Sequence, residues 1–399
     1  MIPMKNKENE IHFLCGNSNL IDELSALKVV QPFSDEVVDF LHSLHLEILA
    51  DQQSRTFPDL ITFAFWCRKN NILKLKKAYH DLEFRLGIGV VFHIAPSNVP
   101  LNFAYSLVAG LLAGNINIVR LSSKEFDQVA LLANCINKLV MDRFQSIKNN
   151  IYLIQYPHNS TITKHLSSLS DGRIIWGGSK TIHTIREFLI APNGIDLGFA
   201  DRYSFCIINA DEYLLAEDKN QIANHFYNDS YTNDQYACSS PSLIFWLGKN
   251  KVEAQNIFWK HLESIVNKKY TLNEEQSMTK LLAFYELSLQ YSCKKEVMPN
   301  NRITRVQMST IDEAVFDYRC GNGFFMEYFI DQLEQIVPFC KKACQTITYY
   351  GIDNETITSL ILKNGAKGCD RIVKIGRGLD FSLVWDGHDL ITMFSRKIG

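Results

Sequence analysis

Apolar positions in the first part of the chain recur at spacings of three and four residues. The positions with this spacing include Val37, Phe40, Leu41, Leu44, Ile48 and Leu49. Such spacing is typical of amphipathic helices, so we expect residues 1 to about 80 to be helical. No pattern of residues in this region indicates chemistry.

From Arg85 onward, short runs of β-branched residues alternate with longer stretches of helical period. The short runs predict strands at Gly89–Ile94, Ile116–Leu121, Ile151–Gln155, Arg173–Trp176 and Ser204–Ile208. The longer stretches predict helices near residues 98–113, 125–145, 160–169 and 179–190. Strands that alternate with helices predict βαβ units and a largely parallel sheet.

A second set of elements follows the first. It comprises a helix near residues 216–228, a strand at Ser242–Leu247, helices across residues 251–290, and strands near Phe324–Ile330 and Thr346–Tyr350. The two sets predict two α/β lobes that join near residue 209. Ligand sites in such proteins tend to lie where lobes meet and beyond the ends of strands, so the loops after the strands are the segments to search.

Composition places the chain among ordinary globular proteins. Of its 399 residues, 46% are hydrophobic and 21% are charged, which is enough apolar material for sizeable cores. Lysine and arginine number 41 against 43 acidic residues, a net charge of −2. A nucleic-acid-binding protein usually has a basic excess, so we expect no nucleic-acid partner.

The N-terminal residues turn polar at once and lack an apolar core, which argues against a secretory signal. The longest apolar stretch, from Phe103 to Ala113, is far shorter than the ~20 residues of a membrane-spanning helix. We therefore expect a cytoplasmic protein without a membrane span. The ten cysteines include no Cys-x-x-Cys pair, and Cys340 and Cys344 have no histidine cluster nearby, so we predict no metal site.

The first segment with candidate chemistry follows the strand that ends at Ile94. Either Ser97 or Asn98 can cap the helix that Pro100 opens, because proline is tolerated in the first helical turn. The functional interpretation is that the Asn98 amide projects beyond the strand and donates to an oxyanion. Both interpretations stay open on the sequence alone.

The second segment lies at the end of the strand Ile116–Leu121. It gathers two cations and two hydroxyls: Arg120, Ser122, Ser123 and Lys124. Arginine binds phosphate in a bidentate fork and lysine acts as a point charge, so this group suits a nucleotide ribose and a 2′-phosphate. An ordinary polar loop is the alternative.

The third segment runs from the strand Arg173–Trp176 into Gly177, Gly178 and Ser179, ahead of a helix. Glycines let the backbone approach a ligand closely, and a helix N-terminus attracts pyrophosphate. The segment is not G-x-G-x-x-G, and Gly87-Ile-Gly89 precedes a strand rather than a helix. A standard Rossmann dehydrogenase is therefore disfavoured.

The fourth segment is a polar loop that ends at Cys238, just before Pro241 and an apolar strand. Cys238 has small neighbours and lies at a loop-to-strand junction, where a thiolate is accessible. Cys135 and Cys206 instead lie within a predicted helix and a predicted strand, and we interpret them as unreactive thiols that pack in the core. Cys238 is therefore the candidate nucleophile, although a cysteine in a polar loop is weak support by itself.

Together these segments resemble the aldehyde dehydrogenase superfamily and, within it, are most similar to the LuxC-type acyl-CoA and acyl-protein thioester reductases. Pro96-Ser-Asn98-Val-Pro100 resembles Pro-Trp-Asn-x-Pro, and Gly114-Asn-Ile-Asn-Ile-Val-Arg120-Leu-Ser resembles Gly-Asn-x-x-x-x-Lys-Pro-Ser. Trp176-Gly-Gly-Ser179 resembles the Gly-Ser turn of the superfamily, Asp234–Pro241 resembles the LuxC nucleophile loop, and residues 371–390 resemble the LuxC C-terminal signature. The five segments occur in the family's order, from about residue 85 to the end.

The resemblance implies an aldehyde-dehydrogenase-like α/β fold, with a Rossmann-type cofactor domain plus an α/β catalytic domain. The expected boundaries are 1–84 for an N-terminal helical segment that packs on the cofactor domain and 85–208 for the nicotinamide cofactor-binding domain. Residues 209–370 are expected to form the catalytic domain with the nucleophilic cysteine. Residues 371–399 are expected to return to the core or to an oligomer interface.

The resemblance also assigns roles to residues. Cys238 is the implied nucleophile and Asn98 helps to form the oxyanion hole. Arg120, Ser122, Ser123 and Lys124 are implied to contact the adenosine ribose, and Gly177, Gly178 and Ser179 the pyrophosphate. The implied reaction is the reduction of an acyl thioester, delivered by CoA or by an acylated protein, to the aldehyde through an acyl-Cys238 intermediate. NADPH is the expected cofactor with NADH as the alternative, and a homo-oligomer is expected.

Two other functions remain open at this point: an aldehyde dehydrogenase that oxidises aldehydes, and an inactive family member that acts as an assembly partner. No Gly-Gly-Lys or Glu-Leu-Gly-Gly motif supplies the general base that releases an acid, which favours the reductase. The chain is shorter than bioluminescence LuxC proteins, so the acyl group stays open. His388 and Asp389 belong to the C-terminal signature, and we interpret them as a structural pair rather than as catalytic residues.

Overall fold

The computed structural model describes residues 11–17, 24, 26–96, 99–296 and 299–399 of a mixed α/β protein. The chain divides into two compact units. The first comprises residues 1–200 and 382–399, and the second comprises residues 201–381. The chain passes from the first unit to the second after Ala200 and returns after Phe381.

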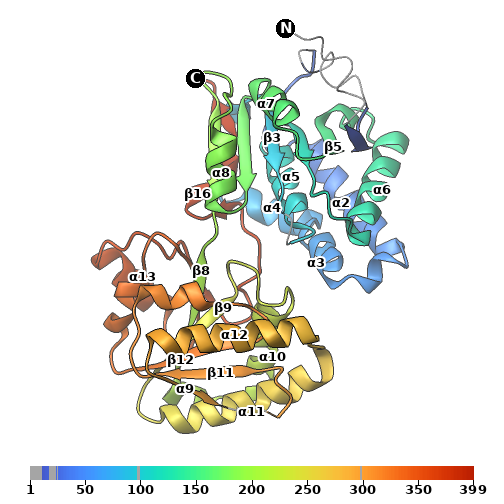
Figure 1. The fold of residues 1–399 in the computed structure, drawn as a ribbon. Coiled ribbons are helices and arrows are strands. Elements are labelled where there is room, and N and C mark those ends of the chain that lie inside the picture. The colour runs from blue at the N-terminus through green and yellow to red at the C-terminus, as the bar shows by residue number, and fades with distance from the viewer. Residues whose placement is uncertain (1–10, 18–23, 25, 97–98, 297–298) are drawn as a thin grey trace. The chain divides into compact units, whose positions relative to one another are not determined.

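A six-stranded sheet forms the centre of the first unit (Figure 1), in the order β1-β5-β4-β3-β6-β7. Its strands are β1 (His12–Cys15), β3 (Val90–Ile94), β4 (Ile116–Arg120), β5 (Ile151–Gln155), β6 (Gly172–Trp176) and β7 (Ile195–Phe199). All pairs are parallel except β1 with β5. The predicted parallel sheet is thus confirmed, with β7 as an additional strand that the sequence reading missed.

Helices cover both faces of this sheet. They are α2 (Asp35–Ala50), α3 (Pro58–Trp66), α4 (Lys69–Lys76), α5 (Asn102–Leu112), α6 (Asp127–Asp142), α7 (Ser160–Ser168), α8 (Ser179–Arg186) and α14 (Leu390–Met393). Alternate strand residues such as Phe92 and Ile118 pack with Ile162 of α7 and Ile182 of α8. α5 lies against β3 and β4 and packs on α2.

The helical prediction for residues 1 to about 80 is correct for α2, α3 and α4 and wrong for residues 12–15. Those residues form β1, which pairs antiparallel with β5 at the sheet edge. An edge strand as short as this one is stabilised by its partner's hydrogen bonds and not by its own pattern.

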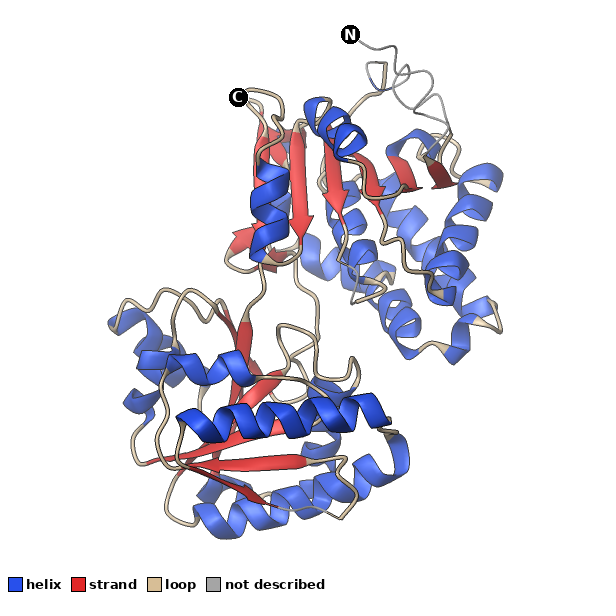
Figure 2. Ribbon diagram, in the orientation of Figure 1, coloured by secondary structure: helices blue, strands red, loops and turns tan. Residues whose placement is uncertain are grey.

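A seven-stranded sheet forms the second unit, in the order β10-β11-β12-β9-β8-β13-β14 (Figure 2). Its strands are β8 (Tyr203–Asn209), β9 (Pro241–Leu247), β10 (Cys293–Glu296), β11 (Thr304–Met308), β12 (Phe324–Ile330), β13 (Cys344–Tyr350) and β14 (Arg371–Lys374). Only β10 runs antiparallel to its neighbour among these described strands. The helices are α9 (Ala210–Leu215), α10 (Lys219–Tyr231), α11 (Lys251–Lys269), α12 (Glu274–Gln290) and α13 (Asn354–Lys363).

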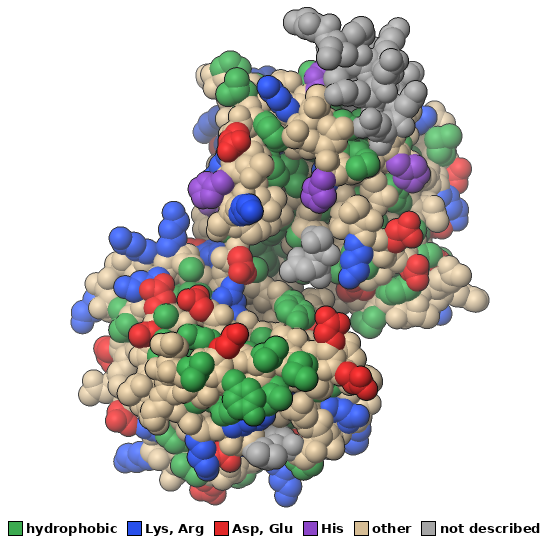
Figure 3. Space-filling view, viewed as in Figure 1, with side chains coloured by type: hydrophobic (Ala, Val, Ile, Leu, Met, Phe, Trp, Pro, Cys, Tyr) green, Lys and Arg blue, Asp and Glu red, His purple; other side chains and the backbone are tan. Residues whose placement is uncertain are grey.

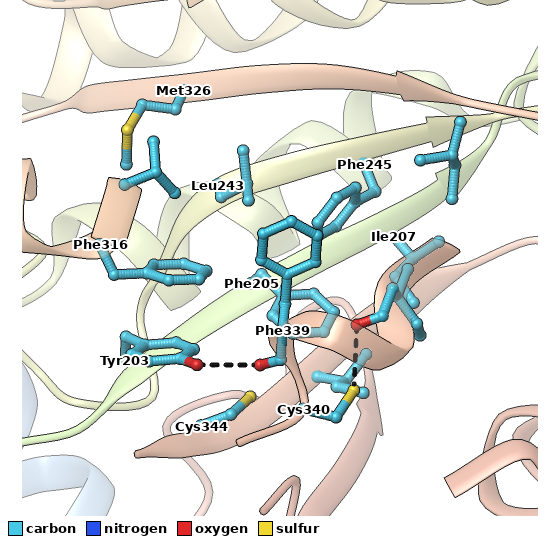
Figure 4. Close-up of a cluster of buried hydrophobic side chains, with 14 of the residues drawn as sticks. Tyr203, Phe205, Ile207, Leu243, Phe245, Phe316, Met326, Phe339, Cys340 and Cys344 are labelled. Carbon is cyan, nitrogen blue, oxygen red and sulfur yellow. Dashed lines mark hydrogen bonds between the residues drawn. The ribbon is translucent and has the colours of Figure 1, made fainter. Parts of the chain in front are cut away.

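The two faces of the second sheet carry separate cores. On one face, Phe205, Leu243 and Met326 pack with α12, α13 and the 3-10 helices Glu313–Tyr318 and Leu333–Phe339. Figure 4 shows this core, in which the Tyr203 hydroxyl donates to the Phe339 carbonyl at 2.9 Å. On the other face, the alternate residues Cys206, Ile244 and Phe325 pack with α9, α10 and α11. The period of two along the strands therefore fills both cores.

α12 has two different faces. Ala283 and Leu287 point into the core, whereas Met278, Leu282, Tyr285 and Leu289 are exposed. Figure 3 shows hydrophobic side chains gathered on the surface of the second unit over the position of α12 in Figure 1. Lys280 is on the buried side of this helix.

The predicted lobe boundary near residue 209 is displaced in the structure. β8 pairs with β9 and β13 in the second sheet, so the boundary between the units falls after Ala200. The C-terminal residues 371–399 are also divided. β14 belongs to the second unit, while residues 382–399 belong to the first and supply β15 (Val384–Trp385), β16 (His388–Asp389), α14 and β17 (Ser395–Lys397).

Several short elements complete the chain. β2 (Arg85–Gly87) pairs with β17, and β15 pairs with β16. Further 3-10 helices lie at Ser54–Thr56, Leu82–Phe84 and Lys148–Asn150. Within the described part of the chain, none of the helices is both long and apolar enough to span a bilayer.

Candidate active site

The carboxyl ends of the parallel strands β3 to β7 meet at one edge of the first sheet. The chain leads from β3 to β4 and β5 in one direction and then to β6 and β7 in the other. In open α/β sheets, ligands bind where the strand order reverses in this way. The crevice beyond β3 and β6 is therefore the candidate cofactor site, and the predicted residues at the ends of β4 and β6 belong to this edge.

A cavity of about 230 Å³ lies at this edge. Its lining includes Pro96 and Pro100 after β3, Ser122, Lys124 and Glu125 after β4, and Gln155 from β5. Ser122 is fixed by two hydrogen bonds: its hydroxyl accepts the Lys124 N–H at 3.1 Å and its carbonyl accepts Gln155 Nε2 at 2.8 Å. The Lys124 ammonium lies 5.0 Å over the Phe126 ring. The structure thus brings Ser122 and Lys124 together, along with a carboxylate that the sequence reading did not single out.

Arg120 and Ser123 do not line this cavity. The Arg120 guanidinium lies 4.8 Å over the Tyr156 ring, and its buried Nε has no hydrogen-bond partner among the described residues. A buried N–H without a partner is costly, so this atom is a candidate for contact with a ligand. Ser123 is exposed to solvent.

Gly177, Gly178 and Ser179 lie at the junction of β6 and α8. The Gly177 N–H donates to the Phe199 carbonyl at 3.1 Å, and Gly178 is the N-cap residue of α8. A Cβ atom built on Gly178 meets nothing within 4 Å. The packing of the chain therefore does not require glycine there, which leaves room for a ligand at the positive end of α8.

Ser97 and Asn98 lie outside the described residues. The oxyanion role of Asn98 therefore stays a prediction.

Cys238 belongs to residues 232–240, which connect α10 to β9 and which we call the thiol loop. Cys238 itself is half-buried. Its carbonyl accepts the Ser204 hydroxyl at 2.6 Å, which ties the loop to β8. The Ser240 hydroxyl donates to the Asp229 carbonyl at 2.7 Å, which ties the loop to α10. The loop that carries the predicted nucleophile is thus hydrogen-bonded to both β8 and α10.

Gln235 connects the thiol loop to the beginning of β12. Its buried amide donates to the carbonyls of Pro241 and Phe324 at 2.9 and 3.1 Å. Its carbonyl oxygen accepts the N–H groups of Gly323 and Phe324 at 3.0 and 3.1 Å. Four hydrogen bonds on one amide fix the backbone three residues before Cys238.

A pair of opposite charges lies beside the thiol. Asp201 Oδ1 is 3.9 Å from Cys238 Sγ, and Asp201 Oδ2 accepts Arg319 Nη2 at 2.6 Å. The sequence reading missed both residues. Asp201 left no signal because the strand Ile195–Phe199, which ends two residues before it, was not predicted, and nothing local connects Arg319 to residue 238.

Burial distinguishes Cys238 from most of the other cysteines. Desolvation raises the pKa of Cys15, Cys206 and Cys320 to about 12, so these thiols resist conversion to thiolate. Cys293 is half-buried on the edge strand β10, whereas Cys238 lies in the loop that precedes the inner strand β9. Among the described residues, no grouping of His, Cys, Asp and Glu could hold a metal ion.

The C-terminal signature is structurally tied to both units. The Asp229 carboxylate accepts the N–H groups of Gly376 and Gly378 at 2.6 and 2.8 Å, and burial raises its pKa to about 7. Asp389 caps α14 and accepts the Tyr79 hydroxyl at 3.1 Å, and His388 packs edge-on against Phe199. These contacts give Asp389 a structural role, as the sequence reading favoured.

Comparisons with known proteins agree on one family. A family model described as acyl-CoA reductase (LuxC) matches residues 68–396. A long-chain acyl-protein thioester reductase of Vibrio harveyi is 26% identical over 323 residues, which are 78% of this chain and 63% of the relative. The chain thus spans less than two thirds of that relative's length.

Solved structures of aldehyde dehydrogenases share the fold. A 1-pyrroline-5-carboxylate dehydrogenase of Thermus thermophilus superposes with a TM-score of 0.66 at 11% identity, covering 98% of this chain and 84% of that one. A succinic semialdehyde dehydrogenase of Streptococcus pyogenes, solved with NADP+, gives a TM-score of 0.62 at 12% identity, with coverages of 92% and 90%. The expected aldehyde-dehydrogenase-like fold is confirmed. Because the family model covers more than half of its residues, the chain belongs to the acyl-CoA reductase (LuxC) family.

Proposed function

We propose that this chain reduces an acyl thioester to the aldehyde with NADPH, through an acyl group carried on Cys238 Sγ. The observation that carries the proposal is the thiol loop. It presents a half-buried cysteine at the start of a central strand and is held by Ser204 and Gln235. A fixed, accessible thiol is what nucleophilic catalysis requires.

In the proposed first step, the Cys238 thiolate attacks the carbonyl carbon of the thioester. The carbon–sulfur bond to the donor breaks, the departing thiolate takes up a proton, and the acyl group is then joined to Cys238 through a new thioester. We propose that the Asn98 amide and the Cys238 N–H stabilise the oxyanion formed on the way.

The first unit offers features that fit a dinucleotide. They are the cavity with Ser122 and Lys124, the Arg120 Nε, which lacks a hydrogen-bond partner within the described part of the chain, and the open space at Gly178 before α8. We propose that these residues, with Ser123, Gly177 and Ser179, hold the cofactor. When bound, NADPH supplies a hydride for the acyl carbon. The resulting thiohemiacetal breaks its bond to Cys238 Sγ, which releases the aldehyde and restores the thiolate.

The names of the relatives inform the choice of substrate. The V. harveyi relative is a long-chain acyl-protein thioester reductase. We therefore propose acyl-CoA or an acylated protein as donor for this chain, which we also propose to work as a homo-oligomer. The absence of a Glu-Leu-Gly-Gly motif supports transfer between thiols over release of a free acid.

The test is aldehyde formation and NADPH oxidation with a panel of acyl-CoAs. We expect turnover in the wild type, none in Cys238→Ala, and wild-type turnover in Cys293→Ala, whose cysteine is also half-buried in the same unit. Turnover that survives in Cys238→Ala would exclude this cysteine as the nucleophile. Acid formed from an aldehyde and NADP+ without a thiol acceptor would instead support the oxidising alternative.

A further inference from the structure

Lys280 is a lysine buried within the second unit. Its side chain is 1% exposed on the inner side of α12. The ammonium donates to two backbone carbonyls, those of Asn301 and Asn322, at 2.5 and 3.0 Å. A buried ammonium costs free energy unless it is well hydrogen-bonded, so these two acceptors are what holds it there.

Asn322 lies in a turn of unusual backbone conformation. Gly321, Asn322 and Gly323 have φ angles of 70°, 58° and 76°, so three consecutive residues are in the left-handed region. Asn322 is fully buried, and although asparagine tolerates this conformation better than other non-glycine residues do, it is still less favourable there than glycine. The Gly321–Gly323 turn therefore depends on the contacts that surround it, the Lys280 ammonium among them.

The same turn holds the thiol loop. The Asn322 N–H donates to the Asp234 carbonyl at 2.8 Å, and the Asn322 amide donates to the Tyr236 hydroxyl at 2.9 Å. Gly323 N–H donates to Gln235 Oε1 at 3.0 Å. Asp234 and Gln235 are themselves left-handed, with φ angles of 50° and 62°. The Gly321–Gly323 turn and the thiol loop thus stabilise each other, and the thiol loop contains Cys238.

We propose that Lys280 is a positioning residue for the nucleophile: its side-chain amino group holds the Gly321–Gly323 turn and, through that turn, the thiol loop that presents Cys238. The inference rests on the proposed role of Cys238. The helix α12, which carries Lys280, would then help to position the nucleophile. The contacts run from Lys280 to Asn322, and from Asn322 to Asp234 and Tyr236 of the thiol loop.

The charge of this ammonium responds to pH near neutrality. Burial lowers the pKa of Lys280, Cys320 beside the turn opposes the shift and Lys295 on β10 adds to it, and the resulting pKa is about 7. A lysine in water titrates near 10.5, so between these two pH values a state that exposes Lys280 binds more protons than the closed state. Opening of the turn and the thiol loop therefore becomes less favourable as the pH rises above 7, while the neutral amine still donates to the two carbonyls.

The test is amide hydrogen exchange of peptides that cover residues 232–240 and 320–324, on the full chain between pH 6 and 9. We expect Lys280→Met to speed exchange in both segments about tenfold after correction for the intrinsic rate, and Lys280→Arg to restore protection because its guanidinium donates to the same carbonyls. Relative to the intrinsic rate, wild-type exchange should slow as the pH rises above 7, and that of Lys280→Arg, which stays charged, should not.

The matched control is Lys219→Met. Lys219 also donates to two backbone carbonyls of the second unit, those of Leu214 and Ala216, at 2.8 and 2.7 Å, but it does not contact the turn. Its removal should leave exchange in the thiol loop unchanged. Unchanged exchange in Lys280→Met would overturn the proposal. If Lys280→Met fails to fold, a wild-type pH dependence identical to that of Lys280→Arg would overturn it instead.

A second measurement separates this proposal from the proposed function. The rate of Cys238 acylation by an acyl-CoA should fall about tenfold in Lys280→Met, with its pH profile changed, and recover in Lys280→Arg. No acylation in the wild type, combined with the expected exchange pattern, would contradict the proposed function and support the role of Lys280 in holding the loop. Normal acylation with a normal pH profile in Lys280→Met would overturn the role of Lys280 and leave the function intact.

Discussion

At the scale of single residues, the surroundings of Cys238 combine a carboxylate and a guanidinium with a thiol. Asp201 is next to Sγ and is bound to Arg319. Its negative charge disfavours the thiolate, and the guanidinium partly cancels that effect. The side chain of Asp201 is 63% exposed, so solvent screens both influences. A change to either charge is therefore expected to alter the reactivity of Cys238.

This balance predicts opposite effects from two substitutions. Asp201→Asn removes the negative charge, so the midpoint of the pH dependence of Cys238 alkylation by iodoacetamide should fall by about half a unit. Arg319→Gln leaves the carboxylate uncompensated, and the midpoint should rise by a similar amount. Both shifts should shrink in 1 M salt. A midpoint that stays constant in both variants would show that the pair does not act on the thiol.

Lys124 gives a second prediction at this scale. Its ammonium borders the cavity at the end of β4, where the ribose of the cofactor is proposed to bind. A 2′-phosphate would gain from this charge, so Lys124→Ala should lower the ratio of kcat/KM for NADPH to that for NADH about tenfold. Lys164→Ala on α7 is the control and should leave the ratio unchanged. Equal efficiency with both cofactors in the wild type would remove the argument for a 2′-phosphate site.

The sequence predicted Cys238, Ser122 and Lys124 because each follows or precedes a strand, where side chains reach a crevice. Lys280 could not be predicted in this way. It lies within an amphipathic helix whose other charged residues are exposed, and its role comes from a turn more than 40 residues later in the chain. Arg319 is similar, since only the fold brings it to Asp201. Residues that act through distant partners leave no local signal.

At the scale of elements, the strands with unbroken apolar runs were predicted closely. β5 and β12 match their predicted bounds, and β3, β4 and β9 differ by one residue at an end. β7 was missed because Asp196 and Gly198 interrupt its apolar pattern. Asp196 is nonetheless satisfied, through ion pairs with Arg173 and Arg186. A prediction based on hydrophobicity misses such a strand, because it does not detect that the charged residue is paired with residues elsewhere in the fold.

A buried polar cluster joins β9, β11, β12 and α11. Glu327 is fully buried and accepts the indole N–H groups of Trp246 and Trp259 at 2.9 and 2.6 Å and Arg305 Nε at 2.9 Å. Gln255 donates to the same carboxylate at 2.9 Å. Because four donors from different elements converge on one carboxylate, the cluster fixes which strands and which helix lie together.

Removal of this carboxylate should therefore be costly. We expect Glu327→Leu to lower the free energy of unfolding by about 3–5 kcal/mol, because it leaves Arg305 buried without a counter-charge. Urea denaturation measures this loss. Glu296→Gln provides the comparison, since it breaks the exposed pair with Lys294 and should cost less than about 1 kcal/mol. A loss in Glu327→Leu no larger than in the control would show that the cluster contributes little.

At the scale of the whole molecule, the chain forms two compact units. The first carries the edge that we propose for the cofactor, and the second carries the thiol loop with the proposed nucleophile. The alternation of strands and helices predicted this division, but not its exact position. β8 looks like a continuation of the first set in sequence, and only its pairing with β9 and β13 assigns it to the second. Strand partners are a tertiary property that a local pattern does not contain.

The central claim is that Cys238 carries the acyl group. Its most direct test is intact-mass analysis of the wild type and of Cys238→Ala after incubation with a panel of acyl-CoAs, first without NADPH and then with it. We predict one acyl adduct on the wild type alone, which disappears on addition of NADPH as the aldehyde forms. An adduct that also forms on Cys238→Ala, or one that persists with NADPH while aldehyde accumulates, would exclude Cys238 as the carrier of the reacting acyl group.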